Sequence, residues 1–302
     1  MARAPAPWLA SLLSLTLPGA GQLYSGKAMR GAGFFAGIVL VLLLAAYLLV
    51  VLISSFGMVL DVVLTLGFVV FAAVDAWRLA ARWPRDTAQP ACSRWFVLVP
   101  AYLLGIIALA SLNTFRKEHI AEAFRYPSTA MEPTLQVGDH FIVDRRRLAR
   151  MPLRQALVAY ESVETPGLKV AKRFVGMPDD TIEMRAGVVF LNGRPLEEPY
   201  LAPAREVYEA DSALRKQMRA WQSPYLAGRK DSGYWPTLND WGPLVVPPDS
   251  YFALGDNRNT SYDSRETGLI PVSHILGRAS HIYLSIDPAG GIRLSRLGKA
   301  LR

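Results

Sequence analysis

Cysteine and histidine are scarce in this sequence, which has one cysteine, Cys92, and four histidines among 302 residues. A single cysteine cannot form an internal disulfide, so the fold does not depend on one even in an oxidising compartment. So few thiol and imidazole ligands also provide no cluster with metal-ligand spacing. The sequence therefore predicts neither a disulfide framework nor a metal site.

Charged residues are rare in the first third of the chain. Hydrophobic residues make up 51% of the sequence and the mean hydropathy is +0.20, which is high for a soluble protein. Residues 31–54, 56–80 and 95–112 are apolar enough to be expected as transmembrane helices. Asp61 and Asp75 in the second segment are tolerable near its ends. For the second and third segments, buried helices of a soluble protein are the alternative.

Residues 1–26 combine a basic start, a short apolar run and small residues, the pattern of a cleavable signal peptide. The run is short, Pro18-Gly19 interrupts it, and more apolar segments follow at once. We therefore favour an interfacial or re-entrant helix for this stretch.

The net charge is +8 and the isoelectric point is near 9.7. Such a balance can indicate nucleic-acid binding, but here the basic residues flank the apolar segments, as the positive-inside rule describes. We therefore expect no nucleic-acid partner. The flanking residues are Lys27, Arg30, Arg78, Arg82, Arg85 and Arg94.

The same charges predict the orientation of the spans. If the basic loops stay in the cytoplasm, the first span exits, the second returns and the third exits. Everything after about residue 113 then lies outside the cytoplasm. Arg116 and Lys117 lie on the side that the rule disfavours, an inconsistency that one short loop can tolerate.

From about residue 113 onward, Pro, Gly and charged residues recur at short intervals and the apolar runs become short and alternating. This pattern predicts a mainly β domain. Asn192-Gly193 between two of the runs predicts a hairpin. The expected strands are residues 140–144, 156–160, 169–175, 181–184, 188–191, 251–254 and 280–286.

The pattern breaks between about residues 201 and 240. Residues 211–221 are expected to form a short helix, and Gly, Ser and Pro follow it. We interpret 201–240 as an insertion or surface subdomain of unknown role. The predicted organisation is a membrane region over residues 1–112, with about three transmembrane helices, and a β-rich domain over residues 113–302.

Lys172 lies in one of the expected strands, where Leu168, Val170 and Phe174 share its face. Burial among apolar side chains disfavours the ammonium form and lowers the pKa of a lysine. A neutral amine can then act as a general base toward a hydroxyl. The alternative is a lysine at a strand end that extends to solvent or pairs with a carboxylate.

A proline-bounded stretch covers residues 126–135, Tyr-Pro-Ser-Thr-Ala-Met-Glu-Pro-Thr-Leu. Its two prolines fix φ and favour extended geometry in the residues before them. In an extended backbone Ser128 and Ala130 point to one side, and Thr129 and Met131 to the other. Considered alone, the stretch could equally be an ordinary turn.

A polar stretch covers residues 255–265, Gly-Asp-Asn-Arg-Asn-Thr-Ser-Tyr-Asp-Ser-Arg. In isolation it would be interpreted as a charged surface loop. Asp256, Arg258 and Arg265 are candidate salt-bridge partners that hold the loop.

Together and in this order, the stretch 126–135, Lys172-Arg173-Phe-Val-Gly-Met-Pro and the stretch 255–265 resemble the signature boxes of the bacterial type I signal peptidases. Those are membrane-anchored serine proteases with a Ser/Lys dyad. Trp241-Gly-Pro and Tyr251-Phe-Ala-Leu-Gly-Asp extend the resemblance, which spans about residues 95–285. It implies N-terminal transmembrane helices followed by a mainly β, signal-peptidase-like catalytic domain. The family usually has one or two spans, so the extra ones inherit no function.

The resemblance also implies roles for individual residues. Lys172 matches the general base, and position 130 matches the nucleophile. The Ser128 hydroxyl and the Ala130 amide match the oxyanion donors, and Ser261 and Asp263 match residues that orient the lysine. The implied substrates are signal peptides of exported preproteins, processed at the bacterial cytoplasmic membrane with the C-terminal domain on the outer, periplasmic side. The implied setting is a lipid bilayer, and no metal or organic cofactor is implied.

The sequence departs from the family pattern at the nucleophile, because alanine stands at position 130 where the family has serine. Four hypotheses follow: an engineered inactive form, a natural homologue that binds without cutting, a nucleophilic role for Ser128, or cleavage by another arrangement. The competing class is a non-catalytic membrane receptor or scaffold for signal peptides or partner proteins. Self-cleaving repressors share the Ser/Lys chemistry, but they are soluble and DNA-binding, and the apolar first third argues against them.

Overall fold

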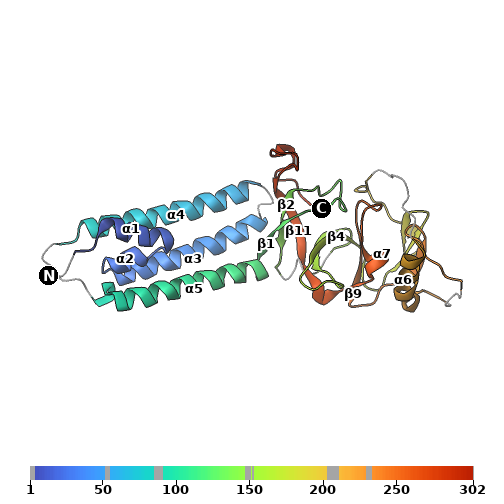
Figure 1. The fold of residues 1–302 in the computed structure, drawn as a ribbon, viewed down its shortest axis with the longest axis horizontal. Helices are drawn as coiled ribbons and strands as arrows, with labels where there is room; N and C mark the ends of the chain where they lie inside the picture. Colours follow the sequence, from blue (N-terminus) through green and yellow to red (C-terminus); the bar gives the residue numbers. More distant parts are fainter. Residues whose placement is uncertain are drawn as a thin grey trace. The chain divides into compact units, whose positions relative to one another are not determined.

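The computed structural model describes residues 4–51, 55–84, 91–146, 151, 153–202, 211–228 and 233–301. The chain forms two compact units, Met1–Glu122 and Ala123–Arg302. The first is helical and the second is rich in β-strands, as Figure 1 shows.

Unit 1 is built around three long apolar helices, α3 (Ala28–Val51), α4 (Ser55–Ala81) and α5 (Trp95–His119). In the part of the chain that the structure describes, all three are long and apolar enough to cross a membrane. The three predicted spans are confirmed as helices. The third is longer than predicted, because α5 continues beyond residue 112 to His119. Basic side chains in its last turn, including Arg116 and Lys117, suit the negative end of the helix dipole.

Two short helices precede α3, namely α1 (Pro7–Thr16) and α2 (Ala20–Tyr24), and a 3-10 turn, η1 (Ala91–Ser93), precedes α5. The predicted break at Pro18-Gly19 separates α1 from α2. Gly19 has φ +103°, and a Cβ there would lie 2.2 Å from the carbonyl oxygen of Gly31. Only glycine fits this close approach between the start of α2 and α3.

A hydrogen-bonded network joins the N-terminal helices to α4. The Gln22 side-chain amide donates to the carbonyl of Ala72 at 2.8 Å and to Asp75 at 3.1 Å. Ser14 donates to Gln22 at 2.9 Å, and Arg30 forms a two-pronged ion pair with Asp75. These partners satisfy the carboxylate of Asp75 inside an apolar helix, where an unpaired charge would be costly.

The β-rich part of the chain contains a seven-stranded sheet in the order β1-β2-β11-β3-β4-β9-β10, whose first strand begins two residues before unit 2. The neighbouring strands from β2 to β10 pair antiparallel. The strands are β1 (Ala121–Arg125), β2 (Asp139–Asp144), β3 (Leu157–Glu161), β4 (Lys169–Gly176), β9 (Ser250–Leu254), β10 (Ile270–Pro271) and β11 (Ile275–Ser285).

A second sheet has the order β7-β6-β5-β8, with β5 (Thr181–Arg185), β6 (Val188–Leu191), β7 (Arg194–Pro195) and β8 (Trp241–Val245). The predicted hairpin is confirmed: β6 and β7 pair antiparallel around Asn192 and Gly193, whose φ angles are both positive. Positive φ at both residues is the requirement of a type I′ turn.

The predicted helix at 211–221 is confirmed as α6 (Ser212–Gln222), which Asp211 caps by accepting a hydrogen bond from the Leu214 amide at 2.8 Å. Its buried Met218 packs in the same apolar cluster as Trp241 of β8. Unit 2 also contains α7 (Ser264–Thr267) and the 3-10 turns η3 (Ser223–Tyr225), η4 (Val272–His274) and η5 (Leu294–Arg296).

Strand β4 lies between two apolar clusters of the large sheet. Phe174 packs with Val158 in one, and Ala171 packs with Leu157 in the other. The alternation predicted for this strand is therefore confirmed for Phe174. It is wrong for Leu168, which precedes the strand and is 51% exposed.

Candidate active site

Lys172 on β4 lies with its amine inside the protein. Its Nζ donates a hydrogen bond to the Oγ of Ser261 at 2.6 Å, and Lys172 is only 3% exposed. In the described parts of the chain no carboxylate oxygen lies within 4.0 Å of this amine. The ammonium is thus bound by a hydroxyl rather than neutralised by an ion pair.

The backbone of Ala130 lies beside the same hydroxyl. A Cβ built on Gly255 would be 2.1 Å from Ser261 Oγ and 2.6 Å from the carbonyl oxygen of Ala130. The Asn257 amide donates to that carbonyl at 3.1 Å. Glycine at 255 therefore lets the 126–135 turn and the 255–265 loop meet next to Lys172.

Burial lowers the pKa of the Lys172 ammonium, because a charge inside the protein loses its hydration. The negative charge of Asp263 opposes this shift, and the positive charge of Arg265 adds to it. A lysine of lowered pKa has a larger neutral fraction near neutral pH, and the neutral amine is the form that accepts a proton.

Residues 130–134 form a turn, so the prediction of extended geometry is wrong for them and the alternative of an ordinary turn is confirmed. The Glu132 amide donates to the Thr129 carbonyl at 3.1 Å, and the Leu135 amide donates to the Met131 carbonyl at 2.9 Å. Ala130 and Met131 are both buried, while Thr129 is exposed. Local hydrogen bonds and burial of Met131 outweigh the preference for extended geometry before proline.

The two groups expected at the oxyanion position contact each other. The Ala130 amide donates to the Oγ of Ser128 at 3.1 Å. An amide that already has an acceptor is not free to bind a substrate oxygen, so this bond has to open before both groups can donate to one oxyanion. In this bond the Oγ of Ser128 is the acceptor, so the hydroxyl proton of Ser128 is not used in it.

Asp256 pairs with Arg173, the residue that follows Lys172 on β4. Two nitrogens of the guanidinium donate to the two carboxylate oxygens at 2.7 Å each, and the side chains are 1% and 0% exposed. Thr134 also donates to Asp256 at 2.5 Å, and Arg173 donates to the Gln155 carbonyl at 2.7 Å. The ion pair therefore joins β4, the 126–135 turn and the 255–265 loop.

Asp263 caps α7 and lies in a second buried ion pair. Its carboxylate accepts from Arg265 at 2.9 Å and from the Gly255 amide at 2.9 Å. Arg265 also donates to the carbonyls of Arg258 at 2.7 Å and Ser261 at 3.2 Å. Arg265 thus holds in place the segment from which Ser261 contacts Lys172. The negative charge of Asp263 acts on Lys172 by raising its pKa.

Glu266 completes the cap of α7 by accepting from the Asp263 amide at 3.0 Å. Burial, and next the charge of Asp263, raise the pKa of Glu266 to about 7. The charge of Glu266 in turn raises the pKa of Lys172. A group that titrates near neutral pH therefore lies among the charges that act on the lysine.

Arg258 pairs with Glu198 and donates to the Gly255 carbonyl at 3.0 Å. The three residues expected as salt-bridge partners, Asp256, Arg258 and Arg265, are thus all in ion pairs. Nothing in the sequence pattern indicated that the partners of the first two would be Arg173 and Glu198, because both lie far away along the chain. Among the described residues no group of three His, Cys, Asp or Glu side chains is placed to hold a metal ion.

The segment near 201–240 supports the site from outside. The Trp221 indole of α6 donates to the Arg265 carbonyl at 3.0 Å, and the Ala202 amide donates to the Asp256 carbonyl at 3.1 Å. The sequence pattern predicted no role for this segment. A short helix over residues 211–221 was expected, but its contact with the 255–265 loop was not.

Similarity to known proteins indicates the family to which the chain belongs. The family model described as "Signal peptidase, peptidase S26" matches residues 95–284. The chain is 32% identical over 206 residues to the probable signal peptidase I-2 of Synechocystis sp., which covers 65% of this chain and 78% of the relative. It is 34% identical over 195 residues to signal peptidase I of Leptolyngbya laminosa, covering 62% and 78%.

A solved structure, signal peptidase I from Enterococcus faecalis V583, has 32% sequence identity and covers 42% of this chain and 95% of its own, with a TM-score of 0.29. Residues 1–94, with α1 to α4, lie before the range of the family match. Since that match spans more than half of the chain and includes the lysine, the turn at 126–135 and the loop at 255–265, the chain belongs to the signal peptidase family, peptidase S26.

Proposed function

We propose that this protein is a membrane-bound endopeptidase of the signal peptidase I type, whose site is shaped to process signal peptides of exported preproteins. The observation that carries the proposal is the buried Lys172 amine, which is bonded to Ser261 beside the backbone of residue 130. A depressed lysine pKa next to a hydroxyl-bearing turn is the arrangement that a Ser/Lys dyad needs.

In the proposed mechanism a serine at position 130 attacks the carbonyl carbon of the scissile peptide bond while the neutral Lys172 amine takes its proton. The tetrahedral oxyanion accepts hydrogen bonds from the amide of residue 130 and the Ser128 hydroxyl, once these two groups separate. Lys172 then protonates the leaving amine, and water activated by the same lysine hydrolyses the acyl-enzyme. Ser261 and Arg265 are positioning residues.

Alanine at position 130 supplies no oxygen for the first step. In the chain as it stands, we therefore propose that the site binds a signal peptide without cleaving it. This second function is that of a receptor for signal peptides. It is favoured because the rest of the site is retained although residue 130 is alanine: Lys172, its contact with Ser261 and the two buried ion pairs are all present. Ser128 is a weaker nucleophile candidate, because its Oγ is engaged by the Ala130 amide.

The proposed setting is the bacterial cytoplasmic membrane. The apolar helices α3, α4 and α5 are the proposed spans, and the basic residues Lys27, Arg30, Arg78, Arg82 and Arg94 are proposed to remain on the cytoplasmic side. Three spans with this orientation would place the β-rich domain on the outer side, where exported preproteins emerge. We propose residues 1–112 as the membrane region and residues 113–302 as the signal-peptidase-like domain.

The test compares the chain with its Ala130→Ser variant, both purified in detergent and incubated with a preprotein. We expect cleavage after the signal peptide by the Ala130→Ser form only, with a gain of several orders of magnitude, because removal of a nucleophile costs about 10⁶-fold in a serine protease. Ala130→Gly serves as the matched control, since it changes the same position without adding an oxygen.

Three outcomes distinguish the alternatives. Cleavage by the unmodified chain that is lost in Ser128→Ala would make Ser128 the nucleophile. No cleavage by either form, together with saturable binding of a signal peptide by both, would establish the receptor function. The proposal would be overturned if the Ala130→Ser form neither cleaved the preprotein nor bound the signal peptide.

A further inference from the structure

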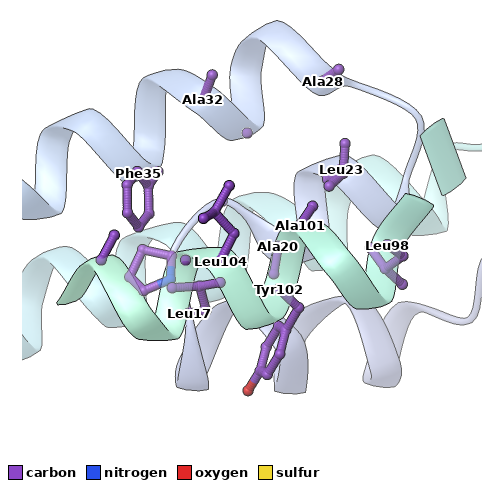
Figure 2. Close-up of a pocket in the computed structure, with 15 residues that line it drawn as sticks. Leu17, Ala20, Leu23, Ala28, Ala32, Phe35, Leu98, Ala101, Tyr102 and Leu104 are labelled. Atoms are coloured by element: carbon purple, nitrogen blue, oxygen red, sulfur yellow. The ribbon is translucent and has the colours of Figure 1, made fainter. Parts of the chain in front are cut away.

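Unit 1 contains an apolar cavity between α2, α3 and α5 with a volume of about 410 Å³. This volume is in the range of ligand pockets. Leu23, Phe35 and Leu104 are among the residues that line it, and Ala28 and Leu98 lie at one end in Figure 2 while Phe35 lies toward the other.

The cavity is elongated along the helices. Its lining on α3 runs from Ala28 to Phe35, and on α5 from Leu98 to Ala108. At 1.5 Å per helical residue these stretches are roughly 10 to 15 Å long. An apolar slot of this length suits a flexible hydrocarbon chain better than a compact ring.

Tight contacts beside the cavity keep its walls in place. A Cβ on Gly31 would lie 2.7 Å from the carbonyl oxygen of Gly19, and a Cβ on Gly105 would lie 2.6 Å from Cδ2 of Leu17. Small residues let helices approach closely in membranes. The cavity is therefore next to well-packed helix contacts that limit how far its walls can collapse.

Two cations lie near the end marked by Ala28 and Leu98. Lys27 directly precedes Ala28, and Arg94 is the N-cap of α5. Both are exposed, and η1, which immediately precedes Arg94, contacts α2. The acid Asp75 on α4 is already bound by Arg30. The end of the slot therefore suits a negatively charged group.

We propose that this cavity binds one acyl chain of an anionic phospholipid, with the phosphate of the headgroup at Lys27 and Arg94. An apolar slot with a basic mouth matches an anionic amphiphile, and basic sites between membrane helices suit such headgroups. A signal peptide fits less well, because its basic start would meet the same cations. Lipid binding at this cavity is separate from the peptidase function and does not depend on it.

The test uses the full chain in detergent and native mass spectrometry with phosphatidylglycerol and phosphatidylcholine that carry identical chains. We expect phosphatidylglycerol to bind at least about tenfold more tightly. Ala101→Phe places a ring in the slot and is expected to weaken phosphatidylglycerol binding about tenfold. Ala110→Phe, on the same helix but outside the cavity lining, is the matched control and should bind like the unmodified chain.

The headgroup contact has its own pair of variants. Lys27→Gln with Arg94→Gln is expected to reduce phosphatidylglycerol binding to the level of phosphatidylcholine. Arg78→Gln with Arg82→Gln removes the same charge from α4 and the residue after it, and should retain the preference. This arm tests the proposal even if Ala101→Phe does not fold.

Three results would overturn the proposal. One is equal binding of the two lipids by the unmodified chain, and another is equal binding by the Ala101→Phe and Ala110→Phe variants when both are folded by circular dichroism. The third is displacement of phosphatidylglycerol by a signal peptide that Ala101→Phe no longer binds, which would assign the cavity to the peptide.

Discussion

The two sides of strand β4 carry consecutive buried cations in opposite environments. Arg173 is held by both oxygens of Asp256, by a backbone carbonyl and by the ring of Tyr200, whose centroid lies 3.9 Å from the guanidinium carbon. Lys172 donates to the hydroxyl of Ser261, and burial lowers its pKa. The positive charge of Arg173 is neutralised by a carboxylate in direct contact, whereas the amine of Lys172 is bonded to a hydroxyl instead.

Of these two neighbouring residues, Arg173 has a structural role and Lys172 a chemical one. A buried guanidinium stays charged at any physiological pH and needs a carboxylate, so Arg173 can tie three segments together. A buried amine without an adjacent carboxylate can lose its proton, which is what a general base requires. The same strand thus supplies a fixed ion pair on one side and a titratable group on the other.

The largest expected effect comes from removing the amine where the chemistry is possible. In the Ala130→Ser background, Lys172→Met should reduce preprotein cleavage by at least about 10³-fold while the thermal unfolding temperature stays near or above its starting value. A general base contributes about 10² to 10⁴, and residues that act as a unit lose more. Initial cleavage rates and thermal unfolding monitor the two properties.

Lys169→Met is the matched control, because Lys169 lies on the same strand but is exposed. Its variant should cleave at a rate close to that of the Ala130→Ser parent. Full activity of the Lys172→Met form would remove the distinction between the two cations and exclude Lys172 as the base.

The next effect, on stability, concerns the other side of the strand. Arg173→Met leaves the carboxylate of Asp256 buried without its main partner, which costs about 3–5 kcal/mol of unfolding free energy. The double variant Arg173→Met, Asp256→Leu should recover part of that loss, because it removes the unpaired charge as well. Denaturant unfolding of the detergent-solubilised chain measures both.

Arg194→Met at an exposed position of β7 provides the reference for a surface change, expected within about 0.5 kcal/mol. If the Arg173→Met form were no less stable than this reference, the ion pair would not hold the site together. A double variant less stable than the single one would also contradict the explanation.

The smallest expected effect is a shift in pH dependence. A negative charge nearby raises the pKa of an ammonium, so Glu266→Gln should lower the pKa of Lys172 and move the acidic limb of the cleavage profile to lower pH. Glutamine retains an oxygen that can accept from the Asp263 amide. The profile is measured in the Ala130→Ser background, with the exposed Glu164→Gln as control. A shift to higher pH would contradict the sign.

The helices and most strands could be predicted from the sequence, because long apolar runs and alternation with period two are local signals. Strand β1 has a polar sequence, Ala-Glu-Ala-Phe-Arg, and β8 contains Gly242-Pro243, so neither carried that signal. The turn at 130–134 was only an open alternative to extended geometry, since proline preferences are local and burial of Met131 is not.

The site was predicted only as a set of separate stretches. Lys172 stood out because it interrupts an apolar strand, and the three boxes indicated which segments should meet. The pairing of Arg173 with Asp256 and of Trp221 with the Arg265 carbonyl depends on contacts between residues more than 40 positions apart. One sequence contains no signal for such pairs, whereas the folded chain determines them by packing.

The 126–135 turn and the 255–265 loop can come into contact because Gly255 has no Cβ atom. A methyl group there would overlap both Ser261 Oγ and the Ala130 carbonyl, so it would separate the two halves of the site without altering a charge or a hydroxyl. In most serine proteases the inert reference protein is made by deleting the nucleophile. This chain already lacks that atom, so position 255 is where a reference protein that differs only in assembly of the site can be obtained.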